Sequence, residues 1–347
     1  MLRSVRIALQ SPLPPLVNAA GVVIEGAAEA SEIDARLIGS GSVFDIEAPD
    51  SVIRGVHVLN APGGAILVRA SGVRLQDLRL ANCDEGLLVA EESDNLVVEQ
   101  VRFEGNRIGA RILSPGRGVI LRNNRFHGNR EVGVSAVRAD WAAGAQRGAL
   151  QLSGNRFQDD RVSLVLGNVA VKVEGNEVLK AREAGIVLIG QGGELRRNRV
   201  TRGAGMGVVA DATRSAVIED NEIDNNGTLG ILVRSSAGAL VRKNRIYDNP
   251  YGVAFVLGER AAPDLAVENV VLRQRFDGII VIGSSPILRH NQMRNSRRAA
   301  LRILDFVPLE GARVAADPYL EGNSATGNLI DAPVRGEYRV QPREVQP

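Results

Sequence analysis

The chain has 347 residues, and its 42 basic and 40 acidic side chains leave a formal net charge of only +2. This balance argues against a nucleic-acid-binding protein, and no segment is long and apolar enough for a membrane span. Aromatic residues make up only 3% of the chain, whereas glycine is abundant, as expected for a solenoid of stacked aliphatic rows and sharp corners.

The N-terminal residues already have the pattern of a strand. Met1-Leu-Arg-Ser-Val-Arg-Ile-Ala-Leu contains no apolar signal core. Because a solenoid needs its open end covered, we expect an export signal and a cap to lie outside this chain. The expected location is therefore extracytoplasmic, either periplasmic or secreted, with a cytoplasmic protein as the alternative.

Asparagine recurs with a long, nearly constant period. Each of these asparagines stands two residues before an apolar residue, and most successive gaps are about 21 to 23 residues, the length of one coil of a three-sided parallel β-helix. The set is Asn124, Asn155, Asn176, Asn198, Asn221, Asn244 and Asn291. In the long gap before Asn291, Val270 is expected to occupy the skipped position. Stacked coils would let these amides bond to one another as an interior ladder.

A glycine marker runs in phase with the asparagines, and apolar residues extend the pattern upstream. Glycines such as Gly86, Gly207 and Gly230 each open a short apolar strand. Val56, Leu78 and Val101 are expected to fill the ladder position in the earlier coils. The sequence therefore predicts an all-β, single-stranded, right-handed parallel β-helix over residues 1–304, with roughly 11–13 coils of about 22–23 residues.

Two insertions fall in the same turn of the repeat, at residues 138–148 and 258–264. Loops on a rigid solenoid commonly carry function, and two loops along one edge can wall a groove. Arg138, Asp140 and Trp141 lie in the first loop, and Arg260 lies in the second. We expect these four residues to contact a ligand, with Trp141 stacking on a sugar ring. The alternative for Trp141 is packing over an exposed apolar patch.

The strand after the corner glycine is apolar on its outer face as well as its inner face. Its predicted outer columns include Leu232, Ala254 and Ile280. An apolar stripe of this kind needs a cover, so the chain is expected to be a monomer with the stripe covered or an oligomer that associates through it. Asp211 and Arg234 form the charged pair within the stripe. They are either an ion pair that holds register or an acid and an arginine that bind or act on a ligand.

Few residues have the pattern of a catalytic or metal site. The three histidines lie in different coils without metal-ligand spacing, so no metal site is expected. His127 is a candidate acid or base, because Glu104 and Gln158 are predicted to be its neighbours on adjacent strands. The coils with Arg102, Arg122, Arg125 and Arg156 are the most basic on this face and the best place for an anionic ligand.

The repeat markers stop near residue 304, whereas apolar residues continue. Pro308, Pro318, Pro333 and Pro342 argue against further regular coils. We therefore expect residues 305–347 to form an irregular segment that caps the last coil and covers part of the apolar stripe, including Ile282.

Asp220-Asn-Glu-Ile-Asp-Asn-Asn and Lys243-Asn-Arg-Ile-Tyr-Asp-Asn-Pro-Tyr-Gly resemble repeats of the right-handed parallel β-helix superfamily. The resemblance covers the chain to about residue 304. It implies the pectate-lyase-like fold and a link to carbohydrates, as in the carbohydrate-associated β-helix repeat proteins. The signatures of polygalacturonases, mannuronan epimerases and pectate lyases are missing, so the resemblance does not decide whether the chain is an enzyme.

Three functions stay open at this stage. The first is a carbohydrate-associated protein that binds a polysaccharide or oligosaccharide along an elongated face. The second is a divergent polysaccharide lyase, hydrolase or epimerase with a groove beside the 138–148 and 258–264 loops. The third is a scaffold or assembly protein that binds a partner chain through its apolar face. No cofactor is expected, except that a lyase would call for Ca²⁺.

Overall fold

The computed structural model describes residues 6–17, 19–26, 31–91, 93–138 and 149–339. The chain divides into two compact units, residues 1–186 (unit 1) and 187–347 (unit 2). In the described residues every regular element is a β-strand. The strands recur in threes, one in each of three parallel sheets, which we name A, B and C. The predicted all-β solenoid is therefore confirmed, with about 12 coils.

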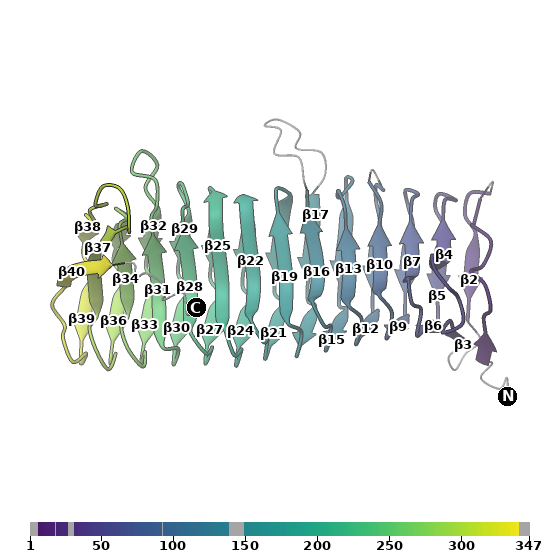
Figure 1. Cartoon of the computed structure of the whole chain (residues 1–347), viewed down its shortest axis with the longest axis horizontal. Coiled ribbons are helices and arrows are strands. Elements are labelled where there is room, and N and C mark those ends of the chain that lie inside the picture. Colours follow the sequence, from purple (N-terminus) through teal and green to yellow (C-terminus); the bar gives the residue numbers. More distant parts are fainter. Residues whose placement is uncertain (1–5, 18, 27–30, 92, 139–148, 340–347) are drawn as a thin grey trace, which may run out of the picture. The chain divides into compact units, whose positions relative to one another are not determined.

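In unit 1, neighbouring coils contribute neighbouring strands to each sheet (Figure 1). Sheet A contains β1 (Arg6–Ala8), β3 (Ser31–Asp34), β6 (Val56–Leu59), β9 (Arg79–Ala81), β12 (Arg102–Glu104), β15 (Arg125–His127), β18 (Arg156–Gln158) and β21 (Glu177–Leu179). Sheet B contains β4 (Ser42–Ile46), β7 (Gly64–Val68), β10 (Glu85–Val89), β13 (Ile108–Ile112), β16 (Val132–Val137) and β19 (Val162–Gly167). Sheet C contains β2 (Val23–Glu25), β5 (Val52–Arg54), β8 (Arg74–Gln76), β11 (Val97–Glu99), β14 (Val119–Arg122), β17 (Ala149–Ser153) and β20 (Ala170–Glu174).

Unit 2 repeats the same arrangement, and β22 (Ala184–Gln191) contains the boundary between the units. Sheet A contains β24 (Arg199–Thr201), β27 (Glu222–Asp224), β30 (Arg245–Tyr247), β33 (Val270–Leu272), β36 (Gln292–Arg294) and β39 (Ser324–Thr326). Sheet B contains β25 (Met206–Arg214), β28 (Leu229–Arg234), β31 (Tyr251–Val256), β34 (Ile279–Ile282), β37 (Leu301–Val307) and β40 (Val334–Arg339). Sheet C contains β23 (Glu194–Arg196), β26 (Val217–Glu219), β29 (Leu240–Arg242), β32 (Leu265–Val267), β35 (Ile287–Arg289) and β38 (Tyr319–Glu321).

Side chains alternate between the interior and the outer face along each short strand, which gives the core its aliphatic rows. In unit 1 three inward phenylalanines stack, with ring centroids 4.5 Å apart between Phe103 and Phe126 and 4.6 Å apart between Phe126 and Phe157. The predicted aliphatic fill of the early ladder position is also correct, since Val56, Leu78 and Val101 are buried.

The asparagine ladder runs through the corner between sheets C and A. In unit 1 the Nδ2 atom of Asn124 donates to Oδ1 of Asn155, at 3.0 Å, and Asn155 donates in turn to Asn176, at 2.9 Å. In unit 2 Asn221 donates to Oδ1 of Asn244 at 3.0 Å. Each amide bonds to the next coil, so the ladder satisfies polar groups that would otherwise be buried without partners.

Two predictions about the repeat were wrong. Val270 does not occupy the skipped ladder position, because Asn269 accepts from Asn244 at 3.0 Å and donates to Asn291 at 2.9 Å. Residues 305–347 are not irregular throughout, because β38, β39 and β40 pair in parallel with β35, β36 and β37. Asn323 continues the ladder there, accepting from Asn291 at 2.9 Å. Pro308 and Pro318 lie between β37 and β38, and Pro333 lies between β39 and β40, outside the paired strands.

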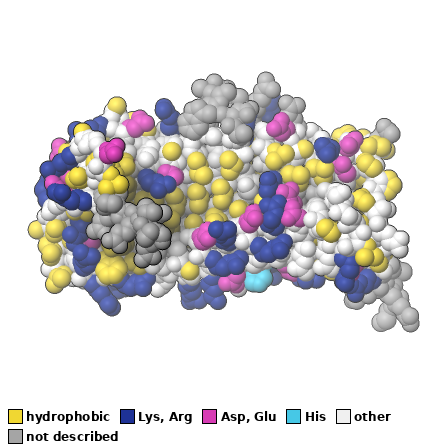
Figure 2. Space-filling model, in the orientation of Figure 1, with side chains coloured by type: hydrophobic (Ala, Val, Ile, Leu, Met, Phe, Trp, Pro, Cys, Tyr) yellow, Lys and Arg dark blue, Asp and Glu magenta, His cyan; other side chains and the backbone are white. Residues whose placement is uncertain are grey.

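The outer face of sheet B in unit 2 carries the predicted apolar stripe. Leu229, Ala254 and Ile280 form a cluster on which Leu232 and Val256 pack. Figure 2 shows hydrophobic side chains gathered over strands of this sheet. Among the described residues, no helix is long and apolar enough to cross a membrane.

Candidate functional site

The residues predicted to bind a ligand around the first loop are mostly outside the described part of the chain. Asp140 and Trp141 lie in the undescribed stretch 139–148, so the predicted stacking platform stays a prediction. Arg138 is half-buried at the end of β16, where its backbone N–H donates to the Gly167 carbonyl at 3.1 Å. Arg260, in the second loop, donates through Nη2 to the carbonyl oxygen of Ala315 at 3.0 Å.

Asp211 and Arg234 face each other on adjacent strands β25 and β28, as predicted. The Nε atom of Arg234 donates to Oδ1 of Asp211 at 2.9 Å, and a second bond joins Nη2 to Oδ2. This two-point pairing raises the pKa of Arg234. Both groups find their main partner in each other, which favours the ion-pair interpretation of these two residues.

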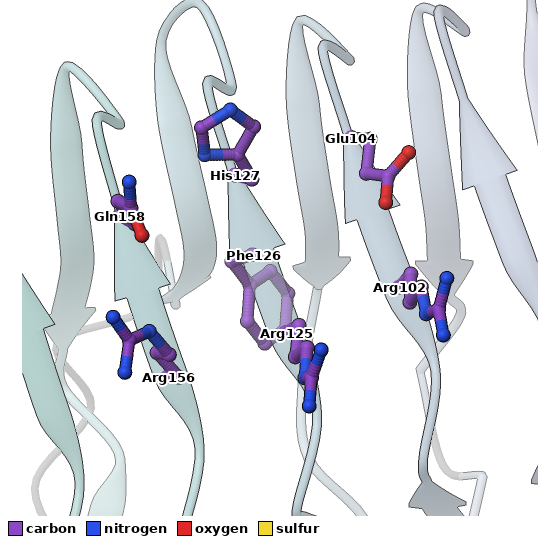
Figure 3. A pocket seen from close by; sticks show the side chains of 7 residues that line it. All are labelled: Arg102, Glu104, Arg125, Phe126, His127, Arg156 and Gln158. Carbon is purple, nitrogen blue, oxygen red and sulfur yellow. The ribbon is translucent and has the colours of Figure 1, made fainter.

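The structure brings together another set of predicted residues in a depression on the outer face of sheet A in unit 1. The depression has a volume of about 410 Å³, and we call it the basic depression (Figure 3). Its lining residues are Arg102, Glu104, Arg125, Phe126, His127, Arg156 and Gln158. Three arginines and one glutamate give this surface a net positive charge.

His127 has the neighbours that the sequence predicts. Glu104 and Gln158 are its partners on the strands to either side, β12 and β18. Its side chain is 57% exposed, and its Nδ1 atom lies 3.9 Å from Oδ2 of Asp159. The imidazole is therefore open to a ligand and flanked by groups that can accept or donate hydrogen bonds.

Arginines occupy one outward position on successive strands of sheet A. Arg79, Arg102, Arg125 and Arg156 are direct partners across the strand pairs, one strand spacing apart. Like charges placed directly opposite each other on neighbouring strands are unfavourable. The sheet keeps this arrangement over four coils, and an anion lying along the column would relieve the repulsion.

Carboxylates neutralise the two ends of this arginine column and leave its centre unpaired. Arg79 contacts Glu104 at 2.8 Å, and Arg156 contacts Glu177 at 2.7 Å. In the described part of the chain, no ion pair engages Arg102 or Arg125, and both side chains are exposed.

The positive charge of the arginine column acts on a neighbouring histidine, His57. Burial and the charge of Arg79 lower the pKa of His57, with a smaller effect from Arg102. Arg122, predicted to add to this basic surface, belongs instead to β14 of sheet C. There its Nε donates to Glu99 at 2.6 Å, so its charge is neutralised. The corner between sheets C and A, at residues 123–124, separates Arg122 from the arginine column.

A second polar depression borders the same arginines on the side of the ladder corner. It has a volume of about 350 Å³ and is lined by Asp77, Gln100, Val101, Arg102, Asn123 and Arg125. Asp77, Gln100 and Asn123 have left-handed backbone conformations, with φ of 51°, 57° and 55°, and form a stacked turn. Arg102 and Arg125 therefore stand between two hollows, one with amides and one with the imidazole.

Within the described ranges, no three His, Cys, Asp or Glu side chains converge in a way that could hold a metal ion. The residues that line the two depressions offer charge-assisted hydrogen bonding from guanidinium groups, hydrogen bonding from amides and proton exchange at an exposed imidazole.

Comparison with known proteins places the chain in a family. The family model described as right handed beta helix region matches residues 17–143 and 142–297, so the chain belongs to this family. This confirms the expected handedness and the resemblance recognised in the repeats. A search of curated proteins finds no match.

Solved structures with the same fold include two carbohydrate-active proteins. The periplasmic alginate epimerase AlgG matches with a TM-score of 0.53 and 16% identity, covering 84% of this chain and 76% of the epimerase. The catalytic unit of a thermostable GH87 alpha-1,3-glucanase from Streptomyces thermodiastaticus strain HF3-3 matches with a TM-score of 0.55 and 13% identity. That match covers 94% of this chain and 64% of the glucanase. At these identities the likeness concerns the fold.

Proposed function

We propose that the chain binds an acidic polysaccharide on the outer face of sheet A in unit 1. The observation that carries the proposal is the pair of unpaired arginines, Arg102 and Arg125, on adjacent strands at the centre of the basic depression. Two guanidinium groups one strand spacing apart, about 4.8 Å, can each hold a carboxylate or sulfate of a polymer that follows the column. The names of the two structural relatives, an alginate epimerase and a glucanase, support a polysaccharide as the ligand.

The binding measurement compares three polymers: a polyuronate, a sulfated polysaccharide and a neutral glucan. We expect the acidic polymers to bind and the affinity to fall with added salt, because exposed charges are screened. Replacing both arginines, Arg102→Gln with Arg125→Gln, should weaken binding by about tenfold or more, since a charge-assisted bond contributes about 1.5–3 kcal/mol.

Arg117→Gln is the matched control for charge. Arg117 is exposed in the turn between sheets B and C of unit 1, outside both hollows. It should leave binding unchanged. Unaltered binding by the Arg102/Arg125 variant, or equal binding of the neutral glucan, would remove the proposal.

A catalytic version of the same site rests on His127. Its exposed imidazole lies on the strand that also carries Arg125, so a sugar held by the arginines would have a proton acceptor beside it. In assays on polyuronates for chain cleavage and for epimerisation, His127→Ala should abolish turnover and keep most of the binding. Absence of turnover by the parent protein would leave a binding protein without catalysis.

An extracytoplasmic location is part of the same proposal, because AlgG is a periplasmic protein and acidic polysaccharides are abundant outside cells. Fractionation of the producing cell, with antibody detection of the full-length protein, tests it. Recovery in the cytoplasm alone would contradict the location and leave the binding proposal standing.

A further inference from the structure

Unit 2 has a second charged depression, at the corner where sheet A turns into sheet B. Its volume is about 670 Å³, and we call it the arginine corner. It is lined by Asn225, Asp248, Arg273, Arg275, Asn295 and Arg297.

A stacked turn gives this corner a regular backbone. Asn225, Asp248, Arg273 and Asn295 have left-handed conformations, with φ of 52°, 57°, 51° and 56°. Each of their N–H groups donates to a carbonyl of the next coil, for example Arg273 to Arg294 at 2.9 Å. The turn thus repeats in consecutive coils, and the side chains project at intervals of one strand spacing.

The charges of the arginine corner do not cancel. Arg273 is neutralised by Asp248, with two bonds of 2.9 and 2.7 Å. Among the described residues, the side chain of Arg275 donates to the backbone carbonyl of Asn226 alone, at 3.4 Å. Arg297 is exposed, and no side chain in the described ranges forms an ion pair with it. Two positive charges, on Arg275 and Arg297, therefore remain in neighbouring coils.

The corresponding corner of unit 1 contains carboxylates that the arginine corner of unit 2 lacks. Arg107, Arg130, Arg161 and Arg182 occupy the position of Arg275 in that unit, as their backbone bonds to the preceding coil show. Arg107 pairs with Glu131 at 2.9 Å, and Arg161 pairs with Glu183 at 2.7 Å. Glu131 and Glu183 directly follow Arg130 and Arg182, so each of those two coils carries an acidic side chain beside its arginine.

In unit 2 the residues that directly follow Arg275 and Arg297 are not acidic. They are Phe276 and Arg298, and the guanidinium carbon of Arg298 lies 5.8 Å from the centre of the Phe276 ring. Phe276 is 41% exposed and packs against Tyr251, with 5.2 Å between ring centroids. An aromatic ring and a third arginine thus stand where unit 1 has the carboxylates of Glu131 and Glu183.

We propose that the arginine corner is an oxyanion-binding site that takes a carboxylate, sulfate or phosphate group of an acidic ligand. Arg275 and Arg297 supply the charge and the forked donors. The exposed amide of Asn295 can add a hydrogen bond to the anion, whereas Nδ2 of Asn225 already donates to Oδ1 of Asp224 at 2.7 Å. This inference does not depend on the polysaccharide site of unit 1.

The test is made in the full chain carrying Arg102→Gln and Arg125→Gln, so that the basic depression is already impaired. Isothermal titration calorimetry uses inorganic phosphate, a uronate oligosaccharide and a sulfated oligosaccharide without carboxylates. We expect saturable binding of at least one of them, weakened by about tenfold or more when Arg275→Gln and Arg297→Gln are added. Comparing the three probes identifies the anionic group preferred.

Arg214→Gln is the matched control, because Arg214 is exposed at the end of β25 and lines none of the depressions described here. It should leave the affinity unchanged. No saturable binding of any of the three probes, or equal weakening by Arg214→Gln, would overturn the inference. The unit 1 proposal is tested separately. It fails if the Arg102→Gln/Arg125→Gln variant binds the acidic polymers as tightly as the parent protein does.

Discussion

Asp160 is a residue whose environment conflicts with its charge. It occupies a second interior ladder, five residues after Asn155 of the first. Its Oδ1 atom accepts from the backbone N and from Nδ2 of Asn129, both at 2.8 Å, and its buried Oδ2 has no hydrogen-bond partner. Burial is the main cause that raises the pKa of Asp160 to about 7.

The other members of this ladder show how a neutral Asp160 would fit. Nδ2 of Asn106 donates to the Leu80 carbonyl at 2.9 Å, and Nδ2 of Asn129 donates to the Phe103 carbonyl at 3.2 Å. One coil further, the equivalent acceptor is the carbonyl of Phe126. A protonated carboxyl at Asp160 can donate to this carbonyl, whereas a carboxylate cannot.

The first prediction concerns pH and Asp160. The pKa of Asp160 is higher in the folded protein than in the unfolded chain. Its contribution to the free energy of unfolding is therefore greatest below about pH 4 and falls as the pH rises toward 7. Over this pH range the protein loses stability on the order of 4 kcal/mol from this group. Asp160→Asn restores a donor at every pH, so it should raise the melting temperature at pH 8 more than at pH 4. Parallel curves for variant and parent between these pH values would contradict a buried neutral acid.

At the scale of the element, the asparagine ladder should contribute most where both neighbouring coils are present. Asn221 donates to the Leu195 carbonyl at 2.9 Å and to Asn244 at 3.0 Å, and its Oδ1 accepts two bonds from Asn198. Asn323, in the last ladder position described, keeps only the bonds to Leu288 and Asn291 and is partly exposed.

The second prediction follows from this difference. Asn221→Leu should destabilise unit 2 more than Asn323→Leu, because each buried polar group left without a partner costs about 1–3 kcal/mol. Chemical denaturation of both variants measures the difference. Equal free energies of unfolding would mean that the ladder bonds contribute little.

Sequence periodicity predicted the elements well wherever one residue type repeats. The first ladder, the strand neighbours of His127 and the arginines at 102 and 125 all follow from residue spacing. Asn269, 25 residues after Asn244, was missed because the ladder position was assigned one residue too late, to Val270. Asn269 itself stands two residues before the apolar Val271, the spacing that the other ladder asparagines share.

The second ladder was missed because its residue type changes from coil to coil. Asn106, Asn129 and Asp160 in unit 1 and Asn226, Asn249 and Gln274 in unit 2 share the position five residues after the first ladder. Their common property is a side-chain oxygen that accepts a hydrogen bond from the backbone of the previous coil.

The charge pairing at the arginine corner could not be predicted from the sequence either, since it depends on which side chains meet across coils.

At the scale of the whole molecule, the strands after residue 305 contribute to the core as well as to the length of the sheets. They cover inward side chains of the preceding coil, and Leu288, Met293 and Ile303 are only 1%, 4% and 2% exposed in their presence. β38 pairs with β35, β39 with β36 and β40 with β37. Removing them would expose this apolar layer together with three unpaired strand edges.

The last prediction tests this role by truncation. A chain ending at Asp305 should melt at a lower temperature than one ending at Arg339, which keeps every described strand, and it should aggregate through the bared layer. Thermal unfolding and light scattering of the two chains measure both effects. The ladder adds a specific cost, because Asn291 loses the oxygen of Asn323 that accepts from it at 2.9 Å. If the two chains melt at the same temperature and both stay monomeric, β38–β40 are an appendage and the stable core ends with β37.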